Sequence, residues 1–203
     1  MLSSGVTGSA FQRGSGAPLR ETFQRHACMI GHSTANGHRA ALLRDAVAGE
    51  AYRENVRKLS CFIGVKTITA LAVLTEVGDF QRFPTAQHFA SYIGLTPGED
   101  SSADDQNRLP ITKAGNGHVR MLLTEAAQCY ARGQIGYKSK TLKARQTGNP
   151  SEIISYADKA NERLRRRYYR MVLKHHKPAN VAKTAVAREL ACFMWGMVTG
   201  NVT

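Results

Sequence analysis

Apolar residues recur at helical spacing along most of the chain after Tyr52. The clearest run follows Asn116, a residue type that commonly caps helix N-termini. Beyond it, apolar side chains occupy positions i, i+3, i+4, i+7, i+8 and i+11, namely Val119, Leu122, Leu123, Ala126, Ala127 and Tyr130. This spacing predicts a helix with one apolar face. No segment shows a competing alternation of apolar and polar residues, so the pattern predicts a mainly α fold.

Two helices joined by a tight bend are predicted upstream of that run. The bend lies at Ile63-Gly64-Val65-Lys66, and Gly78 supplies a C-terminal stop for the second helix. One side of this second helix is expected to bury Ile68, Leu71, Ala72 and Thr75. Thr85 then caps a short helix that ends at Gly94 and carries Phe89 and Ile93. Residues 95–116 are expected to form a loop.

Two long helices are predicted near the C-terminus. A connector over residues 133–150, rich in Gly and Lys, leads to Ser151, a candidate N-cap. Pro178 ends this helix and Asn180 caps the last one. The apolar seam of the first is Ile153, Ala157, Ala160, Leu164 and Met171, and that of the second is Val186, Leu190, Phe193 and Met197.

These patterns divide the chain into three parts. Residues 1–50 are predicted to be a flexible basic arm, with residues 1–20 largely disordered and a short helix over 39–48. Residues 51–132 form a helical domain with a helix-hairpin-helix-like turn, and residues 133–203 hold the Arg-rich helix and the C-terminal helix. The predicted fold class is therefore mainly α, with a helix-hairpin-helix-like start, a small helical domain and long C-terminal helices.

The charge balance indicates a polyanionic partner. The 203 residues include 28 Lys and Arg against 15 Asp and Glu, a net charge of +13 and a pI near 10.0. Nucleic acid and an anionic membrane surface both fit this balance. No apolar stretch is long enough to span a bilayer and no secretion signal is visible, so we expect a cytoplasmic protein without a membrane partner.

Metal and redox chemistry find little support in the sequence. The four cysteines lie far apart, with no C-x-x-C pair, and are expected to be buried reduced thiols. His88 and His118 have no carboxylate or cysteine partner at ligand spacing, and His175-His176 sits at a helix end. We therefore assign no metal ligand and expect no cofactor bound by this chain.

Two segments are candidate nucleic-acid contacts. In the bend, Gly64 and Lys66 could expose backbone N–H groups to a phosphate, although a packing turn without a ligand explains them equally well. The Arg-rich helix could be a solvated surface, but only Glu152, Asp158 and Glu162 oppose its basic residues. Those basic residues are Arg163, Arg165, Arg166, Arg167, Arg170 and Lys174. Tyr168 and Tyr169, interleaved with them, either pack in the core or stack on a nucleotide.

The order of short motifs along residues 63–127 and 176–197 is specific. The segments are IGVKTITALAVLTEVGDFQRFPTAQHFASYIGLTPGEDSS, ITKAGNGHVRMLLTEAA and HKPANVAKTAVARELACFMWGM. Together they resemble the C-terminal transposase domain of the insertion-sequence 110 (116/902) family, over roughly residues 51–197. The resemblance implies DNA transposition, a form of site-specific recombination.

The resemblance also implies a role for one hydroxyl. The family's C-terminal half contributes a serine thought to form a covalent link to a DNA phosphate, and Ser102 is the matching residue, with Ser101 as the alternate. Judged alone, this pair is ordinary loop polarity. The family follows its serine with Gly-Gly and a basic residue, whereas Ala103, Asp104 and Asp105 stand here, and aspartates repel a phosphate. In the following motif, the predicted nucleic-acid contacts are Lys113, Asn116, His118 and Arg120.

The partners follow from the same resemblance. Family members have an N-terminal nuclease-like half with four acidic metal ligands, whereas residues 1–50 offer only Glu21, Asp45 and Glu50 as carboxylates. We therefore expect the C-terminal part of a transposase, with Mg²⁺ acting only when an acidic half is supplied. Expected partners are DNA, a guide RNA, and either further copies of this chain or a full-length transposase. The alternatives are a non-catalytic DNA- or RNA-binding remnant and a decayed gene product.

Overall fold

The computed structural model describes residues 50–102 and 105–202, and its fold is mainly α, as predicted. The predicted arm lies outside these residues except for Glu50, and so does the helix expected over 39–48. In chain order the elements are α3 (Glu50–Leu59), α4 (Thr67–Val77), α5 (Ala86–Ile93), β1 (Pro97–Ser102), β2 (Asp105–Ile111), α6 (Gly117–Gln128), the 3-10 turn η1 (Cys129–Ala131), α7 (Lys140–Gln146), α8 (Ser151–Tyr169), the π-helical turn η2 (Arg170–Lys174) and α9 (Ala179–Thr199).

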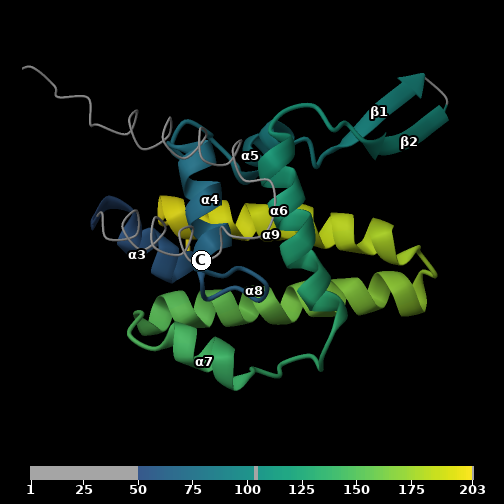
Figure 1. Ribbon diagram of the computed structural model, residues 1–203. Helices are drawn as coiled ribbons and strands as arrows, with labels where there is room; N and C mark the ends of the chain where they lie inside the picture. The colour runs from purple at the N-terminus through teal and green to yellow at the C-terminus, as the bar shows by residue number, and fades with distance from the viewer. Residues whose placement is uncertain (1–49, 103–104, 203) are drawn as a thin grey trace, which may run out of the picture.

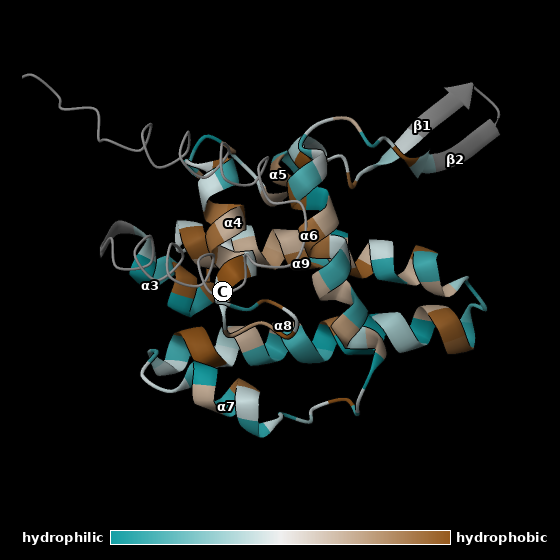
Figure 2. Cartoon of the chain, viewed as in Figure 1, coloured by the Kyte–Doolittle hydropathy of each residue, from teal (hydrophilic) through white to brown (hydrophobic). Residues whose placement is uncertain are grey.

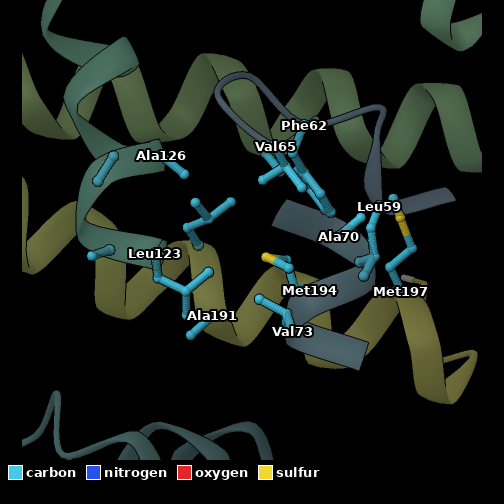
Figure 3. Close-up of a cluster of buried hydrophobic side chains, with 14 of the residues drawn as sticks. Leu59, Phe62, Val65, Ala70, Val73, Leu123, Ala126, Ala191, Met194 and Met197 are labelled. Carbon is cyan, nitrogen blue, oxygen red and sulfur yellow. The ribbon is translucent and has the colours of Figure 1, made fainter. Parts of the chain in front are cut away.

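Helix α9 is the centre of the fold. It contacts α3, α5, α6 and α8, and it runs alongside α8 (Figure 1). Figure 3 shows the buried cluster where α4, α6 and α9 meet, with Val73, Leu123 and Met194 pointing toward one another. Burying a side chain of this size stabilises the fold by about 1.5–3 kcal/mol. Because the cluster draws on α3 to α6 and on α8 and α9, one core supports both the hairpin and the basic helix.

Helix α4 is largely apolar (Figure 2) and is buried along most of its length. Leu71, Ala72 and Thr75 are buried as predicted, but Ile68 is 51% exposed, so its predicted burial is wrong. Residues 66–68 are all exposed, which places the first turn of α4 outside the core. Among the described residues no helix is both long enough and apolar enough to cross a bilayer.

The predicted helix boundaries around the middle of the chain are confirmed. Thr85 accepts a hydrogen bond from the His88 N–H at the start of α5, and Gly94 ends that helix in the left-handed conformation, with φ of 74°. Asn116 accepts from the Val119 N–H at 3.0 Å and begins α6. Gly78 ends α4. These capping residues satisfy backbone groups that a helix end leaves without partners.

The loop predicted over residues 95–116 is instead a two-stranded antiparallel hairpin at its centre. Strand β1 pairs with β2, and a register shift between Pro97 and Glu99 marks an irregular start. Its sequence, PGEDSS and DQNRLPI, is mostly polar and lacks alternating apolar residues, so hydrophobic periodicity had nothing to detect. The hairpin projects away from the helices (Figure 1).

Three local predictions in the C-terminal part are wrong. The connector over residues 133–150 contains helix α7, which Ser139 begins by accepting from the Leu142 N–H at 3.2 Å. Pro150 and Pro178 occupy the N-cap positions of α8 and α9, so neither Ser151 nor Asn180 caps a helix. Proline suits a helix start, because its fixed φ matches the helix and it has no N–H to leave unpaired.

Candidate nucleic-acid interface and serine hairpin

The serine pair lies at the tip of the hairpin. Ser102 is the last residue of β1 and stands opposite Asp105, and Ser101 stands opposite Gln106. Ala103 and Asp104, two of the three positions that depart from the family pattern, lie outside the described residues. Ser102 therefore ends β1 on a hairpin that projects away from the helices (Figure 1).

Backbone hydrogen bonds fix the base of this hairpin to the end of α5. The Thr112 N–H donates to Thr96 O at 2.9 Å, and the Lys113 N–H donates to Gly94 O at 3.2 Å. The Asn116 N–H donates to Tyr92 O at 3.0 Å. The first bond closes the base of the hairpin and the other two join its far end to α5, so the base is attached to the helical core.

The turn between the hairpin and α6 requires glycine. Gly115 has φ of 101°, and a Cβ there would stand 2.0 Å from Tyr92 O. Lys113, which is exposed, also has positive φ, at 54°. This conformation is unfavourable for a side chain other than glycine or asparagine, so surrounding hydrogen bonds must stabilise it.

The start of α6 is cross-linked to α4 through Glu76. Its carboxylate accepts from Asn116 Nδ2 at 3.2 Å, and His118 Nδ1 lies 3.2 Å from its other oxygen. His118 therefore has the carboxylate neighbour that the sequence did not reveal, because Glu76 lies 42 residues earlier. Arg120 is half-buried and donates to Ile93 O at 2.8 Å. Asn116 and Arg120 thus hold the hairpin base in place, and Lys113 is the exposed cation of this motif.

In the bend between α3 and α4, the contacts of Gly64 favour a packing turn over a phosphate-binding turn. A Cβ at Gly64 would stand 2.3 Å from the backbone oxygen of Ala126, so the bend and α6 approach too closely for any side chain. The Ile63 N–H, which could have faced a phosphate, donates to Asn161 Oδ1 at 2.9 Å. Lys66 is exposed at the N-cap of α4.

Asn161 joins this bend to α8. Its side chain is buried, accepts from Tyr130 Oη at 2.8 Å and donates to Cys61 O at 3.1 Å. Burial raises the pKa of the Tyr130 phenol, which keeps its proton and remains a donor. A buried network in which each member has a partner specifies a single arrangement of its elements.

The basic residues of the Arg-rich helix divide into one buried and five accessible side chains. Arg165, one of the predicted nucleic-acid contacts, is instead 8% exposed and donates to Gln134 O at 2.6 Å and Tyr137 O at 2.9 Å. The others form what we call the basic face, namely Arg163, Arg166, Arg167, Arg170 and Lys174. All five line one open groove of about 740 Å³. Many residues of α8 are hydrophilic (Figure 2).

Ion pairs hold only part of this basic face. Arg163 and Arg167 both approach Glu189 of α9, at 2.5 and 3.3 Å, and Arg166 pairs with Glu162 at 2.5 Å. Within residues 50–102 and 105–202, Arg170 and Lys174 make no ion pair and both are exposed. Glu189 was not predicted as a partner, because it reaches the basic face from the next helix.

The paired tyrosines pack rather than project. Tyr168 is buried and meets Tyr169 edge to face, with ring centroids 5.6 Å apart. Tyr169 Oη donates to Gly133 O at 2.9 Å. Packing, the favoured alternative, therefore accounts for both rings, although Tyr169 also lines the groove.

The described part of the chain contains no group of three or more His, Cys, Asp or Glu side chains that could hold a metal ion. Cys61, Cys129 and Cys192 are free thiols, and Cys129 is exposed rather than buried. Burial raises the pKa of Cys61 to about 11. The described residues thus form a basic groove and a projecting hairpin.

Comparison with known proteins identifies a family domain. A sequence model of the Transposase IS116/IS110/IS902 family matches residues 56–144, a range that includes the bend, the hairpin and α6. The chain is 42% identical over 134 residues to the putative transposase y4qE of Sinorhizobium fredii, which covers 66% of this chain and 34% of that protein.

Two further relatives are also named as transposases. A probable family 20 transposase of Pseudomonas aeruginosa is 27% identical over 153 residues, covering 75% of this chain and 37% of that protein. The transposase for insertion sequence element IS1533 of Leptospira borgpetersenii is 28% identical over 141 residues, covering 66% and 39%. The chain thus matches little more than a third of the length of these relatives.

Proposed function

Because the chain belongs to the IS116/IS110/IS902 transposase family through residues 56–144, we propose that it acts in DNA transposition as a nucleic-acid-binding part that presents Ser102 to a DNA phosphate. The observation that carries the proposal is the position of Ser102. It lies at the tip of a projecting hairpin that follows α5 in the chain and whose far end donates backbone hydrogen bonds to Tyr92 and Gly94 at the end of α5. A reacting group must be held close to its target to gain rate from proximity.

The chemistry is a displacement at phosphorus. Ser102 Oγ forms a bond to the phosphorus, one P–O bond to a deoxyribose oxygen breaks, and that oxygen leaves as a hydroxyl after taking up a proton. A serine hydroxyl needs a base or a metal ion to become a useful nucleophile. Since the described residues bring together no metal-ligating group, no step here is assigned to a metal ion in this chain.

The basic face supplies the attraction to nucleic acid. Arg170 and Lys174 are exposed and lack an ion-pair partner among the described residues, and Arg166 has a side chain 66% exposed. Each duplex phosphate that these residues neutralise adds about 0.9 to the slope of log affinity against log salt. A structured guide RNA presents the same phosphates and would meet the same face.

A triple variant tests nucleic-acid binding. Replacing Arg166, Arg170 and Lys174 with alanine is expected to weaken binding of a DNA duplex and to lower the salt slope by up to about 2.7, or about 0.9 for each lost phosphate contact. Replacing the exposed Lys140, Lys143 and Lys159 removes the same charge elsewhere and serves as the control. Equal effects of the two triple variants would remove the basic face from the proposal.

A covalent trap tests the serine. The chain is mixed with DNA and with a full-length relative whose own serine is replaced, the reaction is stopped with detergent, and the digested chain is searched for a nucleotide attached to a peptide. The proposal predicts attachment at Ser102. Attachment that persists in Ser102→Ala, or no attachment although the complex forms, would contradict it.

The second candidate function is a binding module without chemistry. The observation that favours it is the backbone register, which pairs Ser102 with an aspartate, Asp105, a residue type whose negative charge repels a phosphate. On that account the basic face still binds nucleic acid, and the covalent trap gives no product with any variant of the hairpin tip.

A further inference from the structure

Helix α9 lines a second groove, separate from the groove of the basic face. The opposite wall is the base of the hairpin, with Pro97, Pro110 and Ile111, and the α9 wall presents Asn180, Thr184 and Arg188. We propose that this α9 groove binds a single strand of nucleic acid and leads it from the basic face toward the serine hairpin. The inference rests on the proposed function and adds a contact surface to it.

The α9 groove contains one cation, Arg188, without an ion-pair partner among the described residues. Its charged lining residues are Arg167 and Arg188, and no described carboxylate lines it. Arg188 makes no ion pair among the described residues, unlike Arg167, which approaches Glu189. An arginine without a carboxylate partner keeps its hydrogen-bond donors available to a phosphate.

The α9 groove is continuous with the basic face at Arg167, which lines both hollows. Pro97, the first residue of the strand that ends at Ser102, also lines the groove. A strand of this length spans roughly 17 Å at about 3.3 Å per residue. A nucleic-acid strand, with about 3.4 Å between stacked nucleotides, covers that distance with roughly five of them.

The size and lining of the groove favour a single strand over a duplex. Its volume of about 480 Å³ is that of a small-molecule site, which has room for a nucleotide or two. Asn180, Thr184 and Arg188 recur every fourth residue and so share one face of α9. Val181, which is 49% exposed, and Met171 line the same groove and offer apolar contact to the faces of nucleotide bases. A single strand can expose its base faces to such contacts, whereas a duplex keeps them stacked inside.

Photo-crosslinking tests the location. A photoreactive amino acid replaces Val181 in the α9 groove or, as the control, Ile68 on α4, which is 51% exposed and equally branched. Each protein is irradiated with short single-stranded DNA, with RNA of the same sequence, and with the corresponding DNA duplex. We expect several-fold more crosslinking of a single strand from position 181 than from position 68, and little with the duplex. The ratio of DNA to RNA products identifies the preferred strand.

A charge deletion tests the energetic contribution. Arg188→Ala is expected to weaken single-strand binding several-fold and to lower the salt slope by about 0.7 for one lost contact. Lys183→Ala removes the same charge from the same helix at a residue that does not line the groove, and its affinity should stay close to that of the wild type.

The outcomes separate this inference from the proposed function. If the wild-type chain binds no nucleic acid, the proposed function fails and the inference fails with it. If it binds, but Arg188→Ala equals Lys183→Ala and position 181 crosslinks no better than position 68, only the α9 groove is overturned. Duplex that crosslinks at position 181 as strongly as a single strand also overturns the inference.

Discussion

Replacing Arg165 with alanine is expected to destabilise the fold while leaving nucleic-acid affinity unchanged. Replacing the adjacent Arg166 should instead weaken nucleic-acid binding and leave the stability almost unchanged. The two residues are neighbours in sequence with the same charge, but they point in different directions. Arg165 is 8% exposed, and the Arg166 side chain is 66% exposed. The pair therefore separates charge that supports the fold from charge that faces solvent.

The magnitude follows from the contacts of each guanidinium. Arg165 donates two hydrogen bonds to the carbonyls of Gln134 and Tyr137, at 2.6 and 2.9 Å. A hydrogen bond from a charged group contributes about 1.5–3 kcal/mol, but Arg165 Nε is buried without a partner and offsets part of this gain. The net loss in Arg165→Ala is therefore about 2–4 kcal/mol, or roughly 10 °C in Tm for a chain of this size.

Arg166 has much less to lose in stability. Its one ion pair is with Glu162, four residues earlier on the same helix, and an exposed pair of this kind contributes about 0.3–0.5 kcal/mol. Arg166→Ala should instead lower the salt slope of duplex binding by about 0.9, because one phosphate contact is lost.

The assay combines two measurements on each variant. Urea denaturation gives the free energy of unfolding, and fluorescence anisotropy of a labelled duplex over a series of salt concentrations gives affinity and slope. Binding is measured well below the Tm of the less stable variant. An Arg165→Ala protein as stable as the wild type, or one with a reduced salt slope, would refute the inward placement of this side chain.

Three further predictions follow from the geometry. Gly64→Ala should lower the free energy of unfolding, measured by denaturation, by about 2–5 kcal/mol, because positive φ strain adds to a steric clash. Gly200→Ala, with similar φ and open space around it, should lower it by only about 1–2 kcal/mol. Equal losses would contradict the close approach at the bend. At mildly alkaline pH a thiol reagent should modify exposed Cys129 quickly but spare Cys61, whose buried thiol has a pKa of about 11, until the protein unfolds, as peptide mapping would show; early modification of Cys61 would contradict its burial. The 203-residue chain alone should not nick supercoiled DNA even with magnesium, because the described residues assemble no metal site to activate a serine; nicking that disappears in Ser102→Ala would show this reasoning to be wrong.

Helix positions were accessible from sequence wherever one strong local signal decided them. The Asn116 cap and the apolar run after it, and the Thr85 and Gly94 boundaries of α5, depend on residues a few positions apart. The hairpin was missed because its strands are polar and its stability comes from cross-strand backbone pairing. Helix α7 could have been predicted from its Ser139 cap and the good helix formers after it, which a window rich in Gly and Lys concealed.

The candidate site was harder to predict, because its contacts join distant parts of the chain. Glu76 reaches Asn116 and His118 across 40 residues or more, and Glu189 reaches the basic face from another helix. Arg165 looked like its neighbours because six basic residues lie within twelve positions, and only the loop that accepts its hydrogen bonds distinguishes it. Periodicity reports which face of a helix is apolar and carries no information on such long-range partners.

Rescue of recombination in trans tests the central claim, that Ser102 acts on DNA. A full-length relative whose own serine is replaced by alanine is co-expressed with this chain, a donor and a target, and recombination products are counted by sequencing across the junction. A variant in which Asp104 and Asp105 are replaced by Gly and Lys brings two of the three departing positions to the family pattern and removes two charges that repel a phosphate.

We expect recombination products with the wild-type chain, more products with the Gly-Lys variant, and none when Ser102→Ala is introduced into either. Co-purification of the two proteins confirms that the complex forms in each case. Products that survive Ser102→Ala, or no products from the Gly-Lys variant in a confirmed complex, would contradict the account and leave the chain as a nucleic-acid-binding module.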